Sequence, residues 1–333
     1  MEERKSDHIV LALGSRLTAE EADPRFNYEP LGNTIPLNGV QEYLFCGKTL
    51  RVPMWVSSMT GGTRIGRTIN TNLARACNEF GMGMGLGSCR ILLEKPEYFP
   101  DFDMRDVIGP DQPLFANIGI AQVETMIADK SWPRLVELVK NLRADGLIIH
   151  INPIQEWLQP EGDMIFRPPI ETIAEFLSLS DLKIIIKEVG QGMGPESIRA
   201  ALKLDIAGFE LAAFGGTNFA KLELTRSKPQ LQELYAPLSK VGHTAGEMLS
   251  IIEEIVKSGQ EINCKQLIIS GGITSFLDGY YYIEKSTLPA IFGQASVFLN
   301  YARGDYQDLR SFVEHQIKGL EFARAFLKVK KSE

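Results

Sequence analysis

The sequence of 333 residues predicts an α/β fold, a closed (β/α)8 (TIM) barrel that forms one domain. Three observations lead to this prediction: short apolar segments recur along the chain, several are unbroken like parallel strands covered on both faces, and amphipathic stretches separate them. Eight such units favour a closed barrel over an open doubly wound sheet, and one barrel of about 250 residues with insertions accounts for the length. The predicted strands are residues 54–58, 82–87, 114–118, 147–152, 183–189, 208–212, 266–270 and 290–293.

Helices are predicted between these strands from apolar residues that recur on one face. Residues 67–80 show this pattern early in the chain, and the longest instance covers residues 306–327. Two shorter patterns, over 133–142 and 196–203, begin at or just after a proline, which is tolerated in the first turn of a helix. The alternation of strands with helices is typical of a parallel sheet.

Composition limits the classes of partner. The chain has 35 Lys and Arg against 42 Asp and Glu, a net charge of −7 and a pI of about 5.4, which argues against a nucleic-acid partner and a polybasic membrane anchor. The four cysteines are scattered without a CxxC pair, so neither a disulfide framework nor a zinc site is indicated. The charged N-terminus is unlike a signal peptide, and no segment approaches the ~18 apolar residues that span a bilayer. We therefore expect a cytoplasmic protein with reduced thiols and no membrane partner.

Two connections are too long for simple turns. Residues 88–112 follow the second predicted strand, and residues 214–242 follow the sixth. Long connections in a compact domain are usually functional or mobile. Because both follow a strand, we expect both insertions at the C-terminal mouth of the barrel, where active sites of this fold lie.

Polar residues cluster at the C-terminal ends of the predicted strands. Seven such clusters converging on one mouth predict a large polar site that can bind phosphate. They are residues 58–62, 87–90, 117, 150–156, 187–188, 215–217 and 270–273.

Glycines and one lysine favour an anion at this mouth. Gly271 and Gly272 follow the seventh strand and Gly293 lies in the eighth, where backbone N–H groups of barrels usually bind phosphate; the alternative is a plain turn with positive φ. Lys187 ends the apolar run of the fifth strand, where it could hold an anion or work with a lowered pKa. The alternative for Lys187 is a solvated charge paired with Glu188.

The segment after the fourth strand carries His150, Asn152, Gln155 and Glu156. Oxygen ligands on a loop suit Mg²⁺, which completes its shell with water and phosphate, and Glu156 is the natural ligand. The alternatives are a loop that caps the next helix and a core position for His150. At the other end of the chain, the charged residues around Arg4 would normally belong to a disordered tail.

These motifs resemble the type 2 isopentenyl-diphosphate isomerases. The resemblance extends from Arg4 to about Tyr301, and the run HINPIQEWLQPEGD from His150 to Asp163 is its most specific part. The chain departs from the family's pattern at Cys89, Ala212 and Thr274, and it lacks a proline beside Ala295. The matching segments are residues 4–9, 59–62, 87–90, 150–163, 187–190 and 215–219.

The resemblance implies a TIM barrel that binds FMN, requires Mg²⁺, works with the flavin reduced by NADPH, and interconverts isopentenyl and dimethylallyl diphosphate. It implies one domain over residues 1–333, whose tail (1–50) packs over or near the mouth, and a homo-oligomer, either a tetramer or an octamer. It assigns to FMN Ser58, Met59, Thr60, Ser88, Asn117, Lys187 and Thr217, with Gly272, Ile273, Thr274, Ala295 and Ser296 at the phosphate end. It assigns to the substrate Arg4, Lys5, Ser88, Arg90, Asn152 and Gln155, to Mg²⁺ Glu156, and to catalysis Lys187, His150, Glu223 and His8.

Two other functions are compatible with a flavin barrel. An FMN-dependent α-hydroxy-acid oxidase or dehydrogenase needs a histidine base and carboxylate-binding arginines near the seventh strand, and residues 267–274 contain neither. A non-catalytic flavin-binding relative would have lost substrate or metal residues, yet Arg90, Gln155 and Glu156 are present. The isomerase is therefore favoured, with reduced flavin as the acid–base catalyst and Lys187 stabilising its negative charge.

Overall fold

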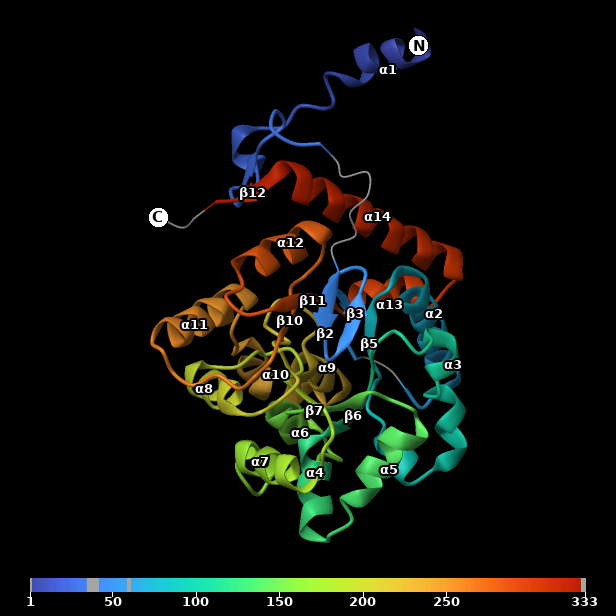
Figure 1. The fold of residues 1–333 in the computed structure, drawn as a ribbon, viewed down its shortest axis with the longest axis vertical. Coiled ribbons are helices and arrows are strands. Elements are labelled where there is room, and N and C mark those ends of the chain that lie inside the picture. Colours follow the sequence, from blue (N-terminus) through green and yellow to red (C-terminus); the bar gives the residue numbers. More distant parts are fainter. Residues whose placement is uncertain (1, 35–41, 59–60, 331–333) are drawn as a thin grey trace.

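The computed structural model describes residues 2–34, 42–58 and 61–330, and it contains a closed barrel of parallel strands (Figure 1). The strands follow one another around the barrel in chain order, and β11 pairs with β4 to close it. All eight predicted strands are confirmed, and their ends differ from the prediction by no more than two residues. They are β4 (Met54–Val56), β5 (Gly83–Gly85), β6 (Leu114–Gly119), β7 (Gly146–His150), β8 (Ile184–Lys187), β9 (Gly208–Glu210), β10 (Leu267–Ser270) and β11 (Ala290–Gln294).

Helices surround the barrel. The predicted helices are confirmed as α2 (Arg64–Phe80), α5 (Pro133–Asn141), α8 (Pro195–Lys203) and α14 (Tyr306–Phe326). Helix α2 begins three residues before the predicted start, because the Thr63 side chain caps it by accepting the N–H of Gly66 at 3.1 Å. The other barrel helices are α4 (Ile120–Ala128), α6 (Pro153–Leu158), α7 (Pro169–Leu179), α11 (Ala245–Lys257), α12 (Phe276–Lys285) and α13 (Ser296–Ala302).

Both long connections are partly helical. Residues 88–112 contain the 3-10 helices η2 (Arg90–Leu93) and η3 (Pro96–Asp101) and the short helix α3 (Arg105–Ile108). Residues 214–242 contain α9 (Phe219–Arg226), α10 (Pro229–Tyr235) and η4 (Ala236–Lys240). These short elements fix the positions of side chains at the mouth.

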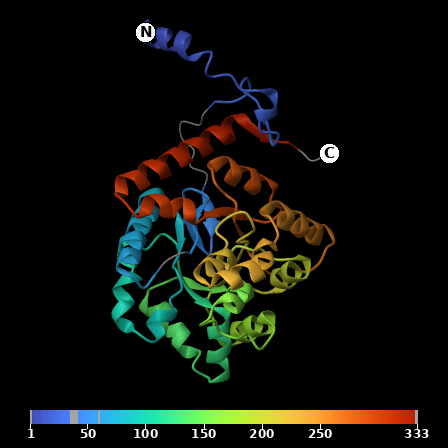
Figure 2. The same cartoon turned by 180° about the vertical axis from the view of Figure 1, so that it is seen from behind.

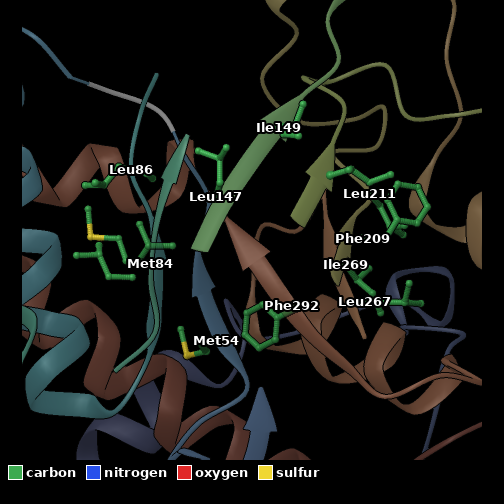
Figure 3. Packing of buried hydrophobic residues seen from close by; sticks show 14 of the residues in the cluster. Met54, Met84, Leu86, Leu147, Ile149, Phe209, Leu211, Leu267, Ile269 and Phe292 are labelled. Atoms are coloured by element: carbon green, nitrogen blue, oxygen red, sulfur yellow. The ribbon is translucent and has the colours of Figure 1, made fainter. Parts of the chain in front are cut away.

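Two clusters of buried apolar residues hold the barrel together. The larger cluster joins the strands to the surrounding helices, and Figure 3 shows members on several barrel strands, among them Met84 of β5, Leu147 of β7 and Phe292 of β11. The smaller cluster combines Trp55 and Phe115 of the barrel with Phe45 from the hairpin of β2 (Tyr43–Phe45) and β3 (Lys48–Leu50). Ring centroids of Trp55 lie 5.3 Å from Phe45 and 6.0 Å from Phe115.

The described parts of the N-terminal segment, residues 2–34 and 42–50, lie away from the mouth, whereas the prediction placed residues 1–50 over or near it. The hairpin packs at the opposite end, where the Cys46 N–H donates to Gln266 (2.8 Å) and Lys183 donates to the Cys46 carbonyl (2.7 Å), just before β10 and β8. Strand β1 (Phe26–Tyr28) pairs with β12 (Leu327–Val329), and the exposed helix α1 (Glu2–Leu11) extends away from the body (Figures 1 and 2). None of the described helices is both long and apolar enough to cross a membrane.

Candidate active site

A hollow at the C-terminal ends of the strands has about 530 Å³ of open space, part of it continuous with solvent. Strands β4, β8, β9, β10 and β11 and the loops that follow them supply its walls, so polar residues meet at one mouth as predicted. Seven of the residues assigned to FMN line it: Ser58, Lys187, Thr217, Gly272, Ile273, Ala295 and Ser296. Met59 and Thr60 lie outside the described residues.

Lys187 is the buried cation of this hollow. It is 6% exposed, and it forms no hydrogen bond or ion pair with any residue that the structure describes. The alternative that Lys187 pairs with Glu188 is wrong, because the Glu188 carboxylate accepts the N–H groups of Val189, Gly190 and Gln191 at 2.5–2.7 Å. Burial raises the pKa of Glu188, and these three bonds oppose the rise. A buried ammonium without a protein partner indicates an anionic ligand.

The glycine pair forms a cradle beside Lys187. Gly271 and Gly272 have φ values of +91° and +73°, so the turn does require glycine. In addition, the N–H groups of Gly272 and Ile273 donate to no acceptor among the described residues. Free N–H groups that share a hollow with a cation suit the oxygens of a phosphate.

Three further polar atoms in the walls lack partners. They are Ser58 Oγ, Glu210 Oε2 and Gln294 Oε1, all buried and all in residues that line the hollow. Buried polar groups are normally hydrogen-bonded, so these atoms indicate a polar ligand. The donor and acceptor set therefore fits FMN, whose ring has a polar edge and whose side chain ends in a phosphate.

Three of the residues assigned to FMN do not line the hollow. The N–H and hydroxyl of Thr274 both donate to Asp278 (3.0 and 2.8 Å), which caps helix α12, so Thr274 does not turn toward the phosphate as expected. Asn117 also does not line the hollow; its amide contacts Leu86 and His150 instead. Ser88 is exposed on the loop after β5 and lies outside the hollow too.

The contact of Asn117 fixes the tautomer of neutral His150. The Asn117 Nδ2 donates to the Leu86 carbonyl at 3.1 Å, which leaves Oδ1 to face His150 Nδ1 at 2.9 Å. Since Oδ1 only accepts, Nδ1 carries the proton and Nε2 is left as an acceptor. Burial, reinforced by the nearby charge of Lys187, lowers the pKa of His150 to about 3. His150 is thus a neutral group with one free acceptor, half-buried at the end of β7.

The specific run after β7 folds into one hydrogen-bonded network. Asn152 Nδ2 donates to Gln155 Oε1 (3.1 Å) and Glu156 Oε1 (2.8 Å) rather than capping α6 with its side chain. Gln155 Nε2 donates to the buried Glu223 of α9 at 3.2 Å. Four residues assigned to the site, up to 71 positions apart in the sequence, therefore lie together: Asn152, Gln155, Glu156 and Glu223. The alternative that this segment only caps the next helix does not account for these contacts.

Asp163 is a member of the site that sequence reasoning did not single out. Its carboxylate bonds Arg90 at 2.5 Å and Gln122 at 2.7 Å, and its N–H donates to Glu156 at 2.7 Å. Arg90 is therefore held next to the Glu156 network. The described residues contain no group of three or more His, Cys, Asp or Glu that could hold a metal, so a metal at Glu156 would take its other ligands from water and substrate.

Arg4, Lys5 and His8 are not brought to the mouth. They lie on the exposed helix α1, which stands off from the barrel in Figure 1. Sequence reasoning also missed Ser57, Glu210 and Gln294 in the walls of the hollow. Glu210 could have been found, since an acidic residue stands inside an otherwise apolar strand.

Comparison with known proteins identifies the relatives. No family model matches the chain. Curated proteins named isopentenyl-diphosphate delta-isomerase are similar over 313 residues: that of Rickettsia felis is 35% identical, covering 90% of this chain and 85% of the relative, and that of Rickettsia typhi is 34% identical, covering 90% and 86%.

Solved structures share the fold at low identity. A mandelate oxidase mutant with the monooxide FMN adduct has a TM-score of 0.57 at 15% identity, covering 92% of this chain and 88% of that one. A flavocytochrome b2 mutant with benzoylformate has a TM-score of 0.63 at 14% identity, covering 91% and 75%. The sequence relationship, unlike these structural ones, is above 30% identity over 90% of this chain. The chain therefore belongs to the isopentenyl-diphosphate delta-isomerase family.

Proposed function

We propose that this protein interconverts isopentenyl and dimethylallyl diphosphate in isoprenoid biosynthesis, with FMN in the hollow and Mg²⁺ at Glu156. The observation that carries the proposal is that a member of this family has an unpaired buried cation and free N–H groups at the same end of the barrel as the network of Arg90, Gln155, Glu156 and Glu223. The first set suits a flavin phosphate and ring, and the second suits a diphosphate with its metal.

When bound and reduced, FMN would supply the proton donor and acceptor at its N5 atom, and NADPH would be the reductant. Lys187 would stabilise negative charge on the ring from its place at the end of β8. Neutral His150 would offer Nε2 as an acceptor without adding positive charge, which would oppose protonation of an alkene. Protonation of the alkene yields a tertiary carbocation, so a closed site that excludes water protects the reaction.

The diphosphate contacts would come from the second network. Arg90 would leave Asp163 to pair with the diphosphate, a stronger partner because it carries more charge. Gln155 and Asn152 would position the same group, and Glu156 would hold Mg²⁺ together with the phosphate oxygens. Binding energy from the diphosphate is remote from the reacting carbons and orients them. Arg4, Lys5 and His8 would have to move to the mouth to take part.

The oxidase alternative is less well supported. Mandelate oxidase and flavocytochrome b2 share only the fold with this chain, and β10 with the loop after it, residues 267–274, contains neither His nor Arg. A non-catalytic role would not require the hydrogen bond between Gln155 and the buried Glu223, which are 68 residues apart in the sequence.

Reconstitution with 5-deaza-FMN, whose N5 is replaced by carbon, tests the catalytic proposal. The wild-type protein should take up FMN and, once reduced, isomerise isopentenyl diphosphate without consuming reductant. The reduced deaza form should bind substrate and fail to isomerise it. Turnover near the rate of the FMN form moves the proton transfer to a side chain, with Glu223 and His150 as the first candidates.

We also propose a cytoplasmic homo-oligomer, a tetramer or octamer. Large apolar side chains on the N-terminal segment are exposed, among them Ile9, Leu13 and Leu31, which supports a contact with another copy of the chain. Light scattering after size-exclusion chromatography tests the assembly, and a monomeric mass contradicts it. The four cysteines are free and buried, in keeping with a reducing compartment.

A further inference from the structure

We propose that Glu210 is the internal counter-ion of Lys187, and that this pair sets how readily the bound flavin is reduced. The inference rests on the proposed binding of FMN in the hollow. It concerns a carboxylate that the family resemblance does not assign to the site.

The two residues face the same space from neighbouring strands. Glu210 ends β9, and its Cα is registered with that of Lys187 at the end of β8. Registered residues of adjacent strands point to the same face of a sheet. Both side chains accordingly line the hollow, and both are buried, with Glu210 completely so.

The environment of Glu210 is built for a carboxylate. Its Oε1 accepts the hydroxyls of Ser57 at 2.5 Å and Ser270 at 3.0 Å. The Ser270 oxygen is itself held by the N–H of Ala212 at 3.0 Å, which leaves the hydroxyl proton for Glu210. Gly293 of β11 leaves room for this cluster, because a Cβ at that position would lie 2.6 Å from Ser57 Oγ. Two hydroxyl donors therefore reach the same oxygen of Glu210.

The second oxygen of Glu210 and the ammonium of Lys187 have no direct partners among the described residues. Oε2 is buried without a partner, and no carboxylate oxygen lies within 4.0 Å of the Lys187 ammonium among the described residues. Each charge is thus unpaired by direct contact, and a buried charge of either sign is strongly unfavourable alone. Their shared hollow lets them offset each other through space.

The consequence concerns reduction of the ring. Oxidised FMN has a neutral ring, and two electrons with one proton give a reduced ring that carries one negative charge. Lys187 favours this charge and Glu210 opposes it. Removing the carboxylate should therefore favour the reduced form, while removing the ammonium should disfavour it.

The test is the reduction potential of the holoprotein, measured against a reference dye during slow anaerobic reduction. Glu210→Gln keeps the shape and removes the charge, and we expect it to favour the reduced flavin at least tenfold, which raises the potential by about 30 mV for a two-electron couple. Glu124→Gln is the matched control. Glu124 is also a buried carboxylate, but it accepts the Phe166 N–H outside the hollow, so its loss should leave the potential unchanged.

The same pair of charges gives a second comparison in the Lys187→Gln background. There the change Glu210→Gln should still raise the potential, but by less than in the wild-type background. This comparison also carries the test if the single Glu210 variant does not fold, since loss of both buried charges is better tolerated than loss of one. The inference is overturned if Glu210→Gln leaves the reduction potential unchanged or lowers it, in whichever of the two backgrounds gives a folded protein.

The outcomes separate this inference from the proposed function. A wild-type protein that takes up no FMN contradicts the cofactor proposal itself. A wild-type protein that binds FMN and isomerises the substrate, but whose potential ignores Glu210, contradicts the counter-ion alone.

Discussion

The adjacent glycines after β10 allow a sharp comparison, because both have positive φ but only one is enclosed. A Cβ on Gly271 would lie 2.0 Å from the Ala213 oxygen and 2.3 Å from its nitrogen, whereas a Cβ on Gly272 would meet nothing closer than 3.6 Å. The left-handed conformation alone costs about 1–2 kcal/mol for alanine. Gly272→Ala should therefore lower the free energy of unfolding by that amount and little more.

Gly271→Ala must also displace backbone. Moving Ala213 breaks its N–H bond to the Ser270 carbonyl (2.8 Å), which adds about 0.5–1.5 kcal/mol, and the residual overlap adds to this. We expect a total loss of roughly 3 kcal/mol or more for Gly271→Ala.

Thermal unfolding of the flavin-free proteins, followed by circular dichroism, measures the difference. At about 2 °C per kcal/mol for a chain of this size, the midpoint should fall by roughly 6 °C or more for Gly271→Ala and by roughly 2–4 °C for Gly272→Ala. Equal shifts for the two variants would falsify the argument from the close approach of Gly271 to Ala213. FMN titration of the same proteins then shows whether the Gly272 variant, although folded, has lost affinity for the phosphate.

Three other predictions concern the second network, the buried histidine and the N-terminal helix. Glu156→Gln should lower Mg²⁺-dependent turnover roughly a hundredfold while FMN stays bound, whereas Glu161→Gln, an exposed change in the same segment, should not; normal metal dependence in the first variant contradicts the metal site. The pKa of His150 is about 3 in the folded protein and about 6.5 when unfolded, so the unfolded state binds the extra proton and stability falls by up to about 1.4 kcal/mol per unit as the pH drops from 6.5 toward 3. Urea titrations of wild type and His150→Gln at several pH values check this, and parallel pH profiles for the two proteins refute it. Replacing Arg4 and Lys5 with alanine should raise KM roughly tenfold or more, since each charged hydrogen bond contributes about 1.5–3 kcal/mol; unchanged kinetics show that helix α1 takes no part.

The barrel could be predicted from sequence because its strands are buried on both faces. Apolar runs such as Ile184 to Ile186 are stable where both faces of the strand are buried, as in a parallel barrel. The polar residue that follows each run marks the mouth of the barrel. The predicted strands continued up to two residues too far at their C-terminal ends, since the pattern of residue types does not show where the backbone leaves the sheet. The order of strands along the chain was therefore enough to predict that these polar residues meet at the mouth.

Other parts depend on side-chain partners that a single sequence does not reveal. Thr274 turns away from the hollow because Asp278, four residues later, takes both of its donors, and Asn117 is held by His150 from the next strand. The position of the hairpin at the end of the N-terminal segment could not be predicted for a similar reason. The hairpin of β2 and β3 carries Phe45 and Leu50, whose burial at the far end of the barrel offers more apolar contact than the polar mouth does.

The hairpin at the far end of the barrel has a consequence for kinetics. Together with Trp55 and Phe115 it fills the floor of the barrel with close-packed apolar side chains, so the path between the hollow and solvent runs through the mouth. A flavin lodged beneath the diphosphate would have to enter first and could not leave while substrate is bound. Saturating isopentenyl diphosphate should therefore slow the exchange of bound FMN for a labelled copy, and it should slow the association of FMN with the flavin-free protein.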